Sequence, residues 1–172
     1  MSTGDTARYR DPVTFTDAAL ERFWAEARSA HTSLPRELPE AWAFGATPEH
    51  ADDLLALVLA GTKTGTASAL ADYGADGEDA EPLPAVGDLS IVLDGADVPR
   101  AVLEVTAIDI AAFDEVTAEH ARAEGEDDRT LASWRRIHED FWTAHAARGF
   151  APDMPVVCER FRVLYAEPPR RP

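Results

Sequence analysis

The sequence predicts a single α+β domain with an N-terminal helical extension. Several segments carry apolar residues at three- and four-residue spacing, which is the period of an amphipathic helix. Others alternate apolar and polar residues, which is the period of a strand. A length of 172 residues is enough for one sizeable core. We therefore expect one domain over residues 14–166, between a mobile tail at 1–13 and a frayed tail at 167–172.

The composition narrows the class of protein. Hydrophobic residues make up 45% of the chain and charged residues 28%, which are ordinary globular values and exclude wholesale disorder. No apolar run approaches the roughly 20 residues that span a bilayer, and the first residues lack the apolar core of a signal peptide. We expect a cytoplasmic protein without membrane contact. The single cysteine, Cys158, excludes an internal disulfide and a thiol pair for zinc.

The net charge of -16 limits the partners. Such a charge repels phosphate backbones at long range, so broad and tight RNA binding is disfavoured. Any nucleic-acid contact must come from a local positive or aromatic patch, or involve a neutral nucleoside. Solubility alone also explains an acidic surface. No motif specific for DNA is present, and we predict no cofactor.

The first expected elements are a helix and an aromatic segment. Thr16 is suited to cap a helix, and Pro35 and Pro39 bracket an extended link after it. Trp42 and Phe44 then lie beside a glycine, which is consistent with a turn that presents both rings to a ligand. Packing of the two rings onto the following helix explains them slightly better.

A second helix leads to the residue that organises the chain. Thr47-Pro48-Glu49 is a strong helix start, and Gly61 is suited to a left-handed cap at the helix end. Lys63 follows, and it is the only lysine among 16 basic residues. Where only positive charge is needed an arginine serves, whereas an ammonium can lose its proton and act as a base or nucleophile. Lys63 is therefore a candidate catalytic residue, although a solvated turn can also retain a lysine by chance.

Hydroxyl residues surround Lys63 in a segment that alternates like a strand. Thr64, Thr66 and Ser68 are candidates for binding or catalysis because of this position. In an ideal strand Lys63 and Thr66 point to opposite faces, so their cooperation requires a bulge or turn at Gly65. A phosphate-binding loop is excluded, because the glycine that must precede the lysine is replaced by a threonine.

The middle of the chain predicts a turn and a strand pair. Residues 69–74 fit a short helix or turn that carries Tyr73, a further candidate for ligand binding. Residues 89–93 and 101–108 fit two strands around a tight turn at Asp94-Gly95. Glu104 interrupts the apolar second strand, so it is either a candidate catalytic carboxylate or a residue of a solvated face.

Two helices and a strand are expected in the last third. Thr117 can cap a short helix, and Asp128 or Thr130 starts a long amphipathic helix that ends at Gly149. His138 and His145 lie on that helix without the spacing of a metal site, so packing explains them better than metal binding. A C-terminal strand is indicated by alternation over residues 157–165.

A lysine, neighbouring hydroxyls and a carboxylate can perform acyl chemistry. A neutral lysine can take the proton of a threonine hydroxyl, whose oxygen then attacks an amide carbonyl. Burial lowers the pKa of a lysine, whereas a nearby carboxylate raises it, so the residues leave the protonation state of Lys63 open.

Four segments resemble the larger bacterial ASCH-domain proteins over roughly residues 20 to 165. They are residues 42–45, residues 57–68 with the sequence Gly-Thr-Lys-Thr, the Val-Gly-Asp at 86–88, and residues 134–142. The resemblance implies a PUA-like fold, in which a small β-barrel flanked by helices forms a cleft for RNA or a nucleoside.

Short proteins with a similar motif hydrolyse N4-acetylcytidine with a lysine, a threonine and a glutamate. The matching positions here are Lys63, Thr66 and Glu104, while other long members resemble RNA-cleaving proteins. The sequence therefore predicts a hydrolase of RNA or a modified nucleoside, with Lys63 as base and Thr66 as nucleophile. The alternative is a non-catalytic module that holds a base against Trp42, Phe44 or Tyr73.

Overall fold

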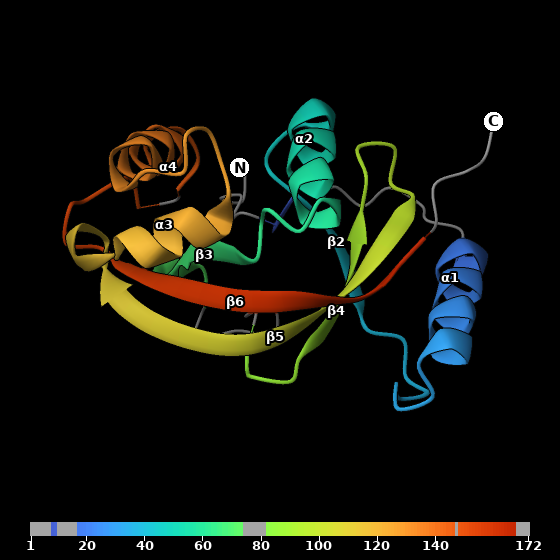
Figure 1. The fold of residues 1–172 in the computed structure, drawn as a ribbon. Helices are drawn as coiled ribbons and strands as arrows, with labels where there is room; N and C mark the ends of the chain where they lie inside the picture. Colours follow the sequence, from blue (N-terminus) through green and yellow to red (C-terminus); the bar gives the residue numbers. More distant parts are fainter. Residues whose placement is uncertain (1–7, 10–16, 74–81, 147, 168–172) are drawn as a thin grey trace.

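A computed structural model describes residues 8–9, 17–73, 82–146 and 148–167. Within these ranges, six strands form one mixed sheet with four α-helices against it (Figure 1). The strands are β1 (Arg8–Tyr9), β2 (Glu40–Phe44), β3 (Gly65–Ala69), β4 (Leu89–Leu93), β5 (Pro99–Ala112) and β6 (Pro155–Ala166). The helices are α1 (Asp17–Ala30), α2 (Pro48–Leu59), α3 (Ala118–Glu124) and α4 (Leu131–His145), with short 3-10 turns η1 (Leu70–Asp72) and η2 (Phe113–Glu115).

The sheet is open and strongly curved. Its strand order is β1-β2-β4-β5-β6-β3, and neighbouring strands are antiparallel except for β2 and β4. The long strands β5 and β6 curve together beneath α3 and α2 (Figure 1). Their register shifts twice, and such bulges bend a strand. The described strands therefore make a half-barrel, with β1 and β3 at its edges, and the predicted α+β class is confirmed.

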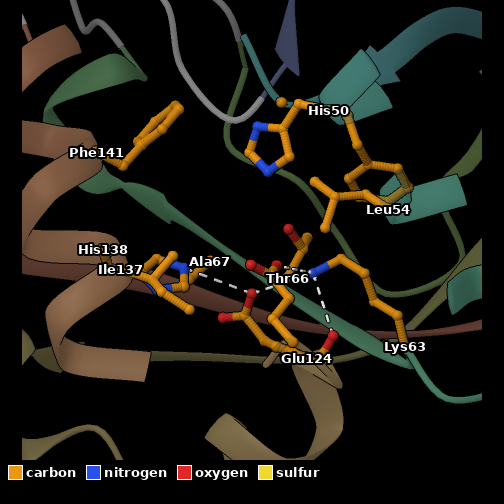
Figure 2. A pocket seen from close by; sticks show the side chains of 12 residues that line it. His50, Leu54, Lys63, Thr66, Ala67, Glu124, Ile137, His138 and Phe141 are labelled. Carbon is orange, nitrogen blue, oxygen red and sulfur yellow. Dashed lines mark hydrogen bonds and ion pairs between the residues drawn. The ribbon is translucent and has the colours of Figure 1, made fainter. Parts of the chain in front are cut away.

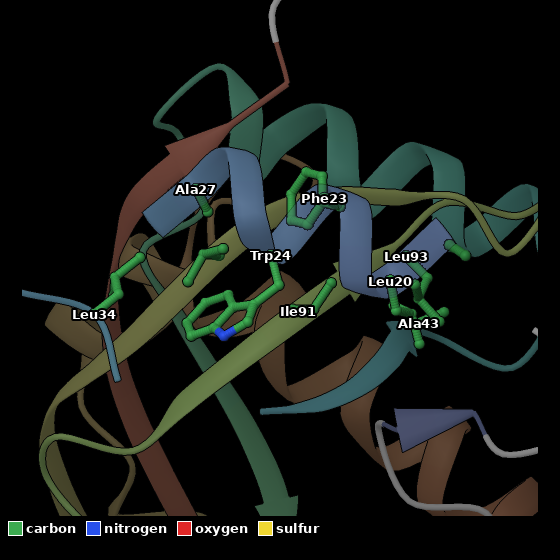
Figure 3. Close-up of a cluster of buried hydrophobic side chains, with 10 residues drawn as sticks. Leu20, Phe23, Trp24, Ala27, Leu34, Ala43, Ile91 and Leu93 are labelled. Carbon is green, nitrogen blue, oxygen red and sulfur yellow. The ribbon is translucent and has the colours of Figure 1, made fainter. Parts of the chain in front are cut away.

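Alternation along the strands sends side chains to two faces, which different helices cover. Trp24 of α1 belongs to a buried cluster with Ala43 of β2 and Ile91 of β4 (Figure 3). The next residues along those strands, Phe44 and Val92, point the other way and pack against α2. The apolar stripes of α1 and α2 thus close the two faces at one end of the sheet.

A third cluster closes the other end of the sheet. Trp134 and Trp142 of α4 are buried there with Phe113 of η2 and Cys158 of β6. Their ring contacts place α4 against η2 and beside α3 (Figure 1). None of the helices within the described ranges combines the length and the apolar character that crossing a membrane requires.

The threonine helix caps predicted from the sequence are present wherever the capping residue is among the described residues. The hydroxyls of Thr47, Thr117 and Thr130 each accept a hydrogen bond from the backbone amide three residues later. Gly61 follows α2 with a φ of 72°, the left-handed conformation that glycine adopts without strain. The expected cap at Thr16 lies outside the described residues.

Three expectations differ from the structure. Trp42 and Phe44 lie in strand β2, not in a turn that presents them, and their packing under α2 confirms the alternative expected from the sequence. Helix α4 ends at His145, four residues before Gly149, because Ala146 leaves the helical region with a ψ of 132°. Residues 8 and 9, expected in a mobile tail, pair with β2.

Candidate functional site

The backbone of Lys63 is fixed between the ends of two helices. After Gly61, the amides of Thr62 and Lys63 both donate to the carbonyl of Leu57 in the last turn of α2. The amide of Thr64 then donates to the carbonyl of Ala123 near the end of α3. Strand β3 begins only at Gly65, so Lys63 does not follow the alternation of the strand. Lys63 and Thr66 consequently line the same pocket, without a bulge between them.

Gly125 brings the end of α3 against the backbone beside Lys63. It has a φ of 76°, and a Cβ atom built there would lie only 2.6 Å from the carbonyl oxygen of Thr62. A glycine is therefore required both for the left-handed cap and for the close approach. Glu124 and Glu126 flank this glycine, and both side chains reach Lys63.

The Lys63 side chain is 1% exposed and bonded to both carboxylates (Figure 2). Its Nζ donates to Oε1 of Glu126 at 2.9 Å and to Oε2 of Glu124 at 3.2 Å. A third, longer contact of 3.5 Å joins Nζ to the backbone carbonyl of Glu124. The only lysine of the chain is thus a buried cation between two acids.

Glu124 is the centre of the polar network. Its side chain is also 1% exposed, and it accepts hydrogen bonds from Trp134 Nε1 at 2.7 Å and from His120 Nε2 at 2.9 Å. His138 Nε2 lies 3.5 Å from its other oxygen. Burial alone would raise the pKa of this carboxyl, but the charges of Lys63 and His138 and the hydrogen bonds hold it well below its ordinary value. Glu124 is therefore ionised and fixed.

The same carboxylates decide the charge of Lys63. Burial lowers the pKa of the Lys63 ammonium, but the attraction of Glu126 and Glu124 outweighs burial and leaves the pKa raised. Lys63 is accordingly protonated at neutral pH. In this state it donates hydrogen bonds and holds no lone pair with which to accept a proton.

His138 joins the network from α4. Its ring stacks on Trp134 with 4.2 Å between centroids, and Nδ1 donates to the Trp134 carbonyl at 2.9 Å. A neutral ring would then turn the Nε2 lone pair toward Glu124. Burial lowers the pKa of His138, but Glu124 and Glu126 outweigh burial and raise it.

The pocket beside this network is narrow. It has about 40 Å³ of free space, and its polar floor is formed by Lys63, Thr66, Glu124, Glu126 and His138. Apolar and aromatic side chains form the walls, with those of α2 facing those of α4 (Figure 2). They include Phe44, His50, Leu54, Ile137 and Phe141. Apolar and aromatic walls above a polar floor suit the faces and the polar edge of a planar ring.

The structure brings together only part of the site predicted from sequence. Phe44, Lys63 and Thr66 line the pocket. Trp42 lies behind Phe44, edge-on at 4.6 Å between ring centroids. Outside the lining, Thr64 Oγ1 bonds the Ala123 carbonyl at 3.4 Å.

Ser68 and Tyr73 are bonded to each other. Ser68 Oγ and the hydroxyl of Tyr73 are 2.7 Å apart, and neither residue lines the pocket. The two residues therefore stabilise the end of β3 and the turn after it. Their position does not support the ligand contact expected from the sequence.

The expected catalytic carboxylate of Glu104 is corrected by the structure. Register pairs Glu104 of β5 with Arg162 of β6, and the two side chains form an ion pair. The preceding Leu103 faces the cluster beneath α2, so alternation turns Glu104 away from it. Glu104 therefore belongs to the solvated face that the sequence left as its alternative, and Glu124 holds the place beside Lys63.

Sequence reasoning missed Glu124, Glu126 and His138 as site residues. For the two glutamates the available signal was the short helix capped by Thr117 and ended at Gly125, since acids at a helix C-terminus oppose the helix dipole and need another cation to stabilise them. Cys158 is buried, and burial raises the pKa of its thiol to about 12. No group of three metal-ligating side chains occurs within the described part of the chain.

A model of the ASCH-domain family matches residues 40–165. The chain belongs to the ASCH-domain family. The ASCH-domain chain is 34% identical to protein EF3133 from Enterococcus faecalis V583, covering 86% of this chain and 89% of that one, with a TM-score of 0.76. It is 27% identical to an ASCH domain from Lactobacillus crispatus JV V101, covering 86% and 95%, also with a TM-score of 0.76. None of the curated proteins compared matches it.

These comparisons confirm the resemblance and the PUA-like α+β fold predicted from the sequence. Helix α1 precedes the matched residues and is the predicted N-terminal helix. The Lys63 pocket lies wholly within the ASCH-domain match, since its lining runs from Phe44 to Phe141.

Proposed function

We propose that the Lys63 pocket binds a base of RNA or a modified nucleoside and hydrolyses an amide on it, as in N4-acetylcytidine. The observation that carries the proposal is the meeting of a buried ammonium and a threonine hydroxyl in one aromatic-walled pocket. Thr66 is 9% exposed and lies at the floor beside Lys63 (Figure 2). Membership of the ASCH-domain family supports an RNA-type ligand.

The reaction proceeds by acyl transfer to Thr66. The hydroxyl oxygen adds to the amide carbonyl carbon, the C–N bond breaks, and water then hydrolyses the threonine ester. The protonated Lys63 donates a hydrogen bond to the developing oxyanion. The base predicted from sequence was Lys63 itself, which requires the ammonium first to pass a proton to Glu126. Otherwise the Glu126 carboxylate takes the threonine proton directly and returns it to the leaving nitrogen.

Turnover of N4-acetylcytidine, as the free nucleoside and as a residue within RNA, by purified protein tests the proposal. Thr66→Val removes the hydroxyl at nearly constant shape, and Thr66→Ser restores it, so we expect activity to be lost in the first and retained in part in the second. Lys63→Arg keeps the charge but not the ammonium geometry, and we expect a loss of about a hundredfold or more. Turnover of neither substrate, or a fully active Thr66→Val, would show that this mechanism is wrong.

A non-catalytic reader of the same ligands is the second candidate. The full pairing of Lys63 with Glu124 and Glu126 favours it, because a protonated lysine that is bonded to two carboxylates can hold a ligand but cannot act as a base. This function predicts nucleoside binding without turnover, with unchanged ligand recovered after long incubation. Affinity that survives both Lys63→Met and Phe44→Ala would count against it.

A further inference from the structure

The hydrogen-bonding capacity of the Lys63 ammonium is already used within the protein. An ammonium has three N–H donors, and three acceptors of the chain lie within 3.5 Å of Nζ. Two of the three belong to Glu124 and the third to Glu126. Of these contacts, the one to the Glu124 backbone carbonyl is the longest. An incoming acceptor can replace this contact most easily.

The charged groups of this network also compensate one another. One ammonium and two carboxylates give a net formal charge of -1, which a protonated His138 brings to zero. Within this network no positive charge is left over for an anion. A phosphate or carboxylate that enters must approach Glu126 and Glu124 in a partly desolvated site, where like charges repel strongly. The lysine of the Gly-Thr-Lys-Thr segment is thus unsuited to a phosphate.

The two carboxylates differ in what else holds them. Glu124 is tied by Trp134 and His120 and is fully buried. Glu126 is 15% exposed, lines the pocket, and has its hydrogen bond with Lys63. It has acceptor capacity left for a ligand, because a carboxylate has about four lone-pair positions.

The loop around Glu126 keeps its carboxylate in place. Asp127 and Arg129 both have positive φ values, 47° and 65°, which are uncommon for residues other than glycine. The Arg129 guanidinium donates to the Arg122 carbonyl, and Asp127 pairs with Arg136 at 2.7 Å. The Arg129 contacts hold the turn that carries Glu126, whereas the exposed Asp127–Arg136 pair adds little to it.

We propose that Glu126 determines the specificity of this pocket: it excludes phosphate and carboxylate groups and accepts an N–H from an uncharged base edge whose neighbouring carbonyl binds Lys63. The ligand class is therefore a neutral base that offers both a C=O acceptor and an N–H donor, as the ring of uridine and the acetamido group of N4-acetylcytidine do, and that is recognised by its base and not by its phosphate. This inference rests on the nucleoside-type ligand proposed above. The exclusion of anions stands on the charges alone.

The single lysine allows a direct test by NMR. Protein labelled with ¹⁵N at lysine has one Nζ signal, from Lys63. The wild type, Glu126→Gln and Asp127→Asn are titrated with inorganic phosphate, uridine, N4-acetylcytidine and 3-methyluridine. Asp127→Asn is the matched control, because it removes one carboxylate of the same loop that faces Arg136 and not the pocket. The methylated ring lacks the N–H that Glu126 would accept.

We expect phosphate to leave the Lys63 signal of the wild type and of Asp127→Asn unchanged, and to bind Glu126→Gln at least about tenfold more tightly. Uridine or N4-acetylcytidine should shift the wild-type signal, and 3-methyluridine should bind about tenfold more weakly than uridine. If wild type and Glu126→Gln bind phosphate equally, or if none of the three proteins binds it, the exclusion of anions by Glu126 is overturned.

The nucleoside results separate this inference from the proposed function. If phosphate binds only Glu126→Gln while no nucleoside binds any protein, the charge filter stands and the nucleoside ligand is wrong. If nucleosides bind but methylation makes no difference, the pairing of Glu126 with an N–H is wrong. Binding without turnover leaves the specificity of Glu126 intact and removes only the hydrolytic mechanism.

Discussion

The Nζ atom of Lys63 and the Oε2 atom of Glu124 are 3.2 Å apart, and each side chain is 1% exposed. Two ions so fully removed from water lose several kcal/mol of hydration each, so they remain charged only because they compensate each other. Glu124 has further donors in Trp134 and His120, whereas Lys63 depends on the two glutamates. The site is thus stable only as a complete network.

Lys63→Met should destabilise the fold by about 3–5 kcal/mol, because it leaves Glu124 and Glu126 without their cation. Chemical denaturation checks the free energy of unfolding. Arg136→Met is the matched control, since its ion pair with Asp127 is exposed and should contribute less than about 1 kcal/mol. Equal losses in the two variants would contradict the importance of burial.

Trp134→Phe should cost more stability than Trp142→Phe. The two tryptophans lie on α4, and both are buried. The indole N–H of Trp134 donates to Glu124, and its removal should cost about 1–3 kcal/mol beyond the lost volume. The indole N–H of Trp142 has no hydrogen-bond partner among the described residues, so only the lost volume should count. Thermal unfolding of both variants measures the difference, and a larger loss for Trp142→Phe would contradict it.

Gly125→Ala should be more damaging than Gly61→Ala. Both glycines have a φ above 70°, so each alanine meets backbone strain of about 1 kcal/mol. Space around Gly61 is open within 4 Å, whereas a Cβ at Gly125 would lie 2.6 Å from the Thr62 carbonyl oxygen and 3.0 Å from the Lys63 amide. We expect Gly125→Ala to shift the Lys63 Nζ signal as well. An unchanged Lys63 Nζ signal in a folded Gly125→Ala protein would argue against this packing.

Stability should fall with rising pH through the contribution of His138. Its pKa is raised in the fold above the ordinary 6.5, so the folded state binds the proton more tightly than the unfolded chain. The stabilisation is fully present below about pH 6.5 and is lost as the pH rises through the folded pKa. The difference in unfolding free energy between wild type and His138→Gln should therefore shrink toward alkaline pH. In a Glu124→Gln background this pH dependence should largely vanish, because the main attracting charge is gone.

Local patterns were sufficient to predict much of the fold. Capping by Thr47, Thr117 and Thr130 and the left-handed Gly61 depend on neighbours within a few residues, so the sequence identified them correctly. The ASCH-domain resemblance rested on similar short segments and was confirmed. Alternation alone misjudged Lys63 and Thr66, because the strand begins later than the pattern suggested.

The sequence by itself determined that Lys63 is unusual, since one lysine among many arginines is visible without a structure. Only the tertiary structure decided which acid it meets and which charge it carries. Glu124 lies 61 positions away and reaches Lys63 because Gly125 lets α3 approach the backbone of Thr62. Glu104, nearer along the chain, is turned to Arg162 by the register of β5 and β6. Such proximity follows from packing between elements, which no local periodicity encodes.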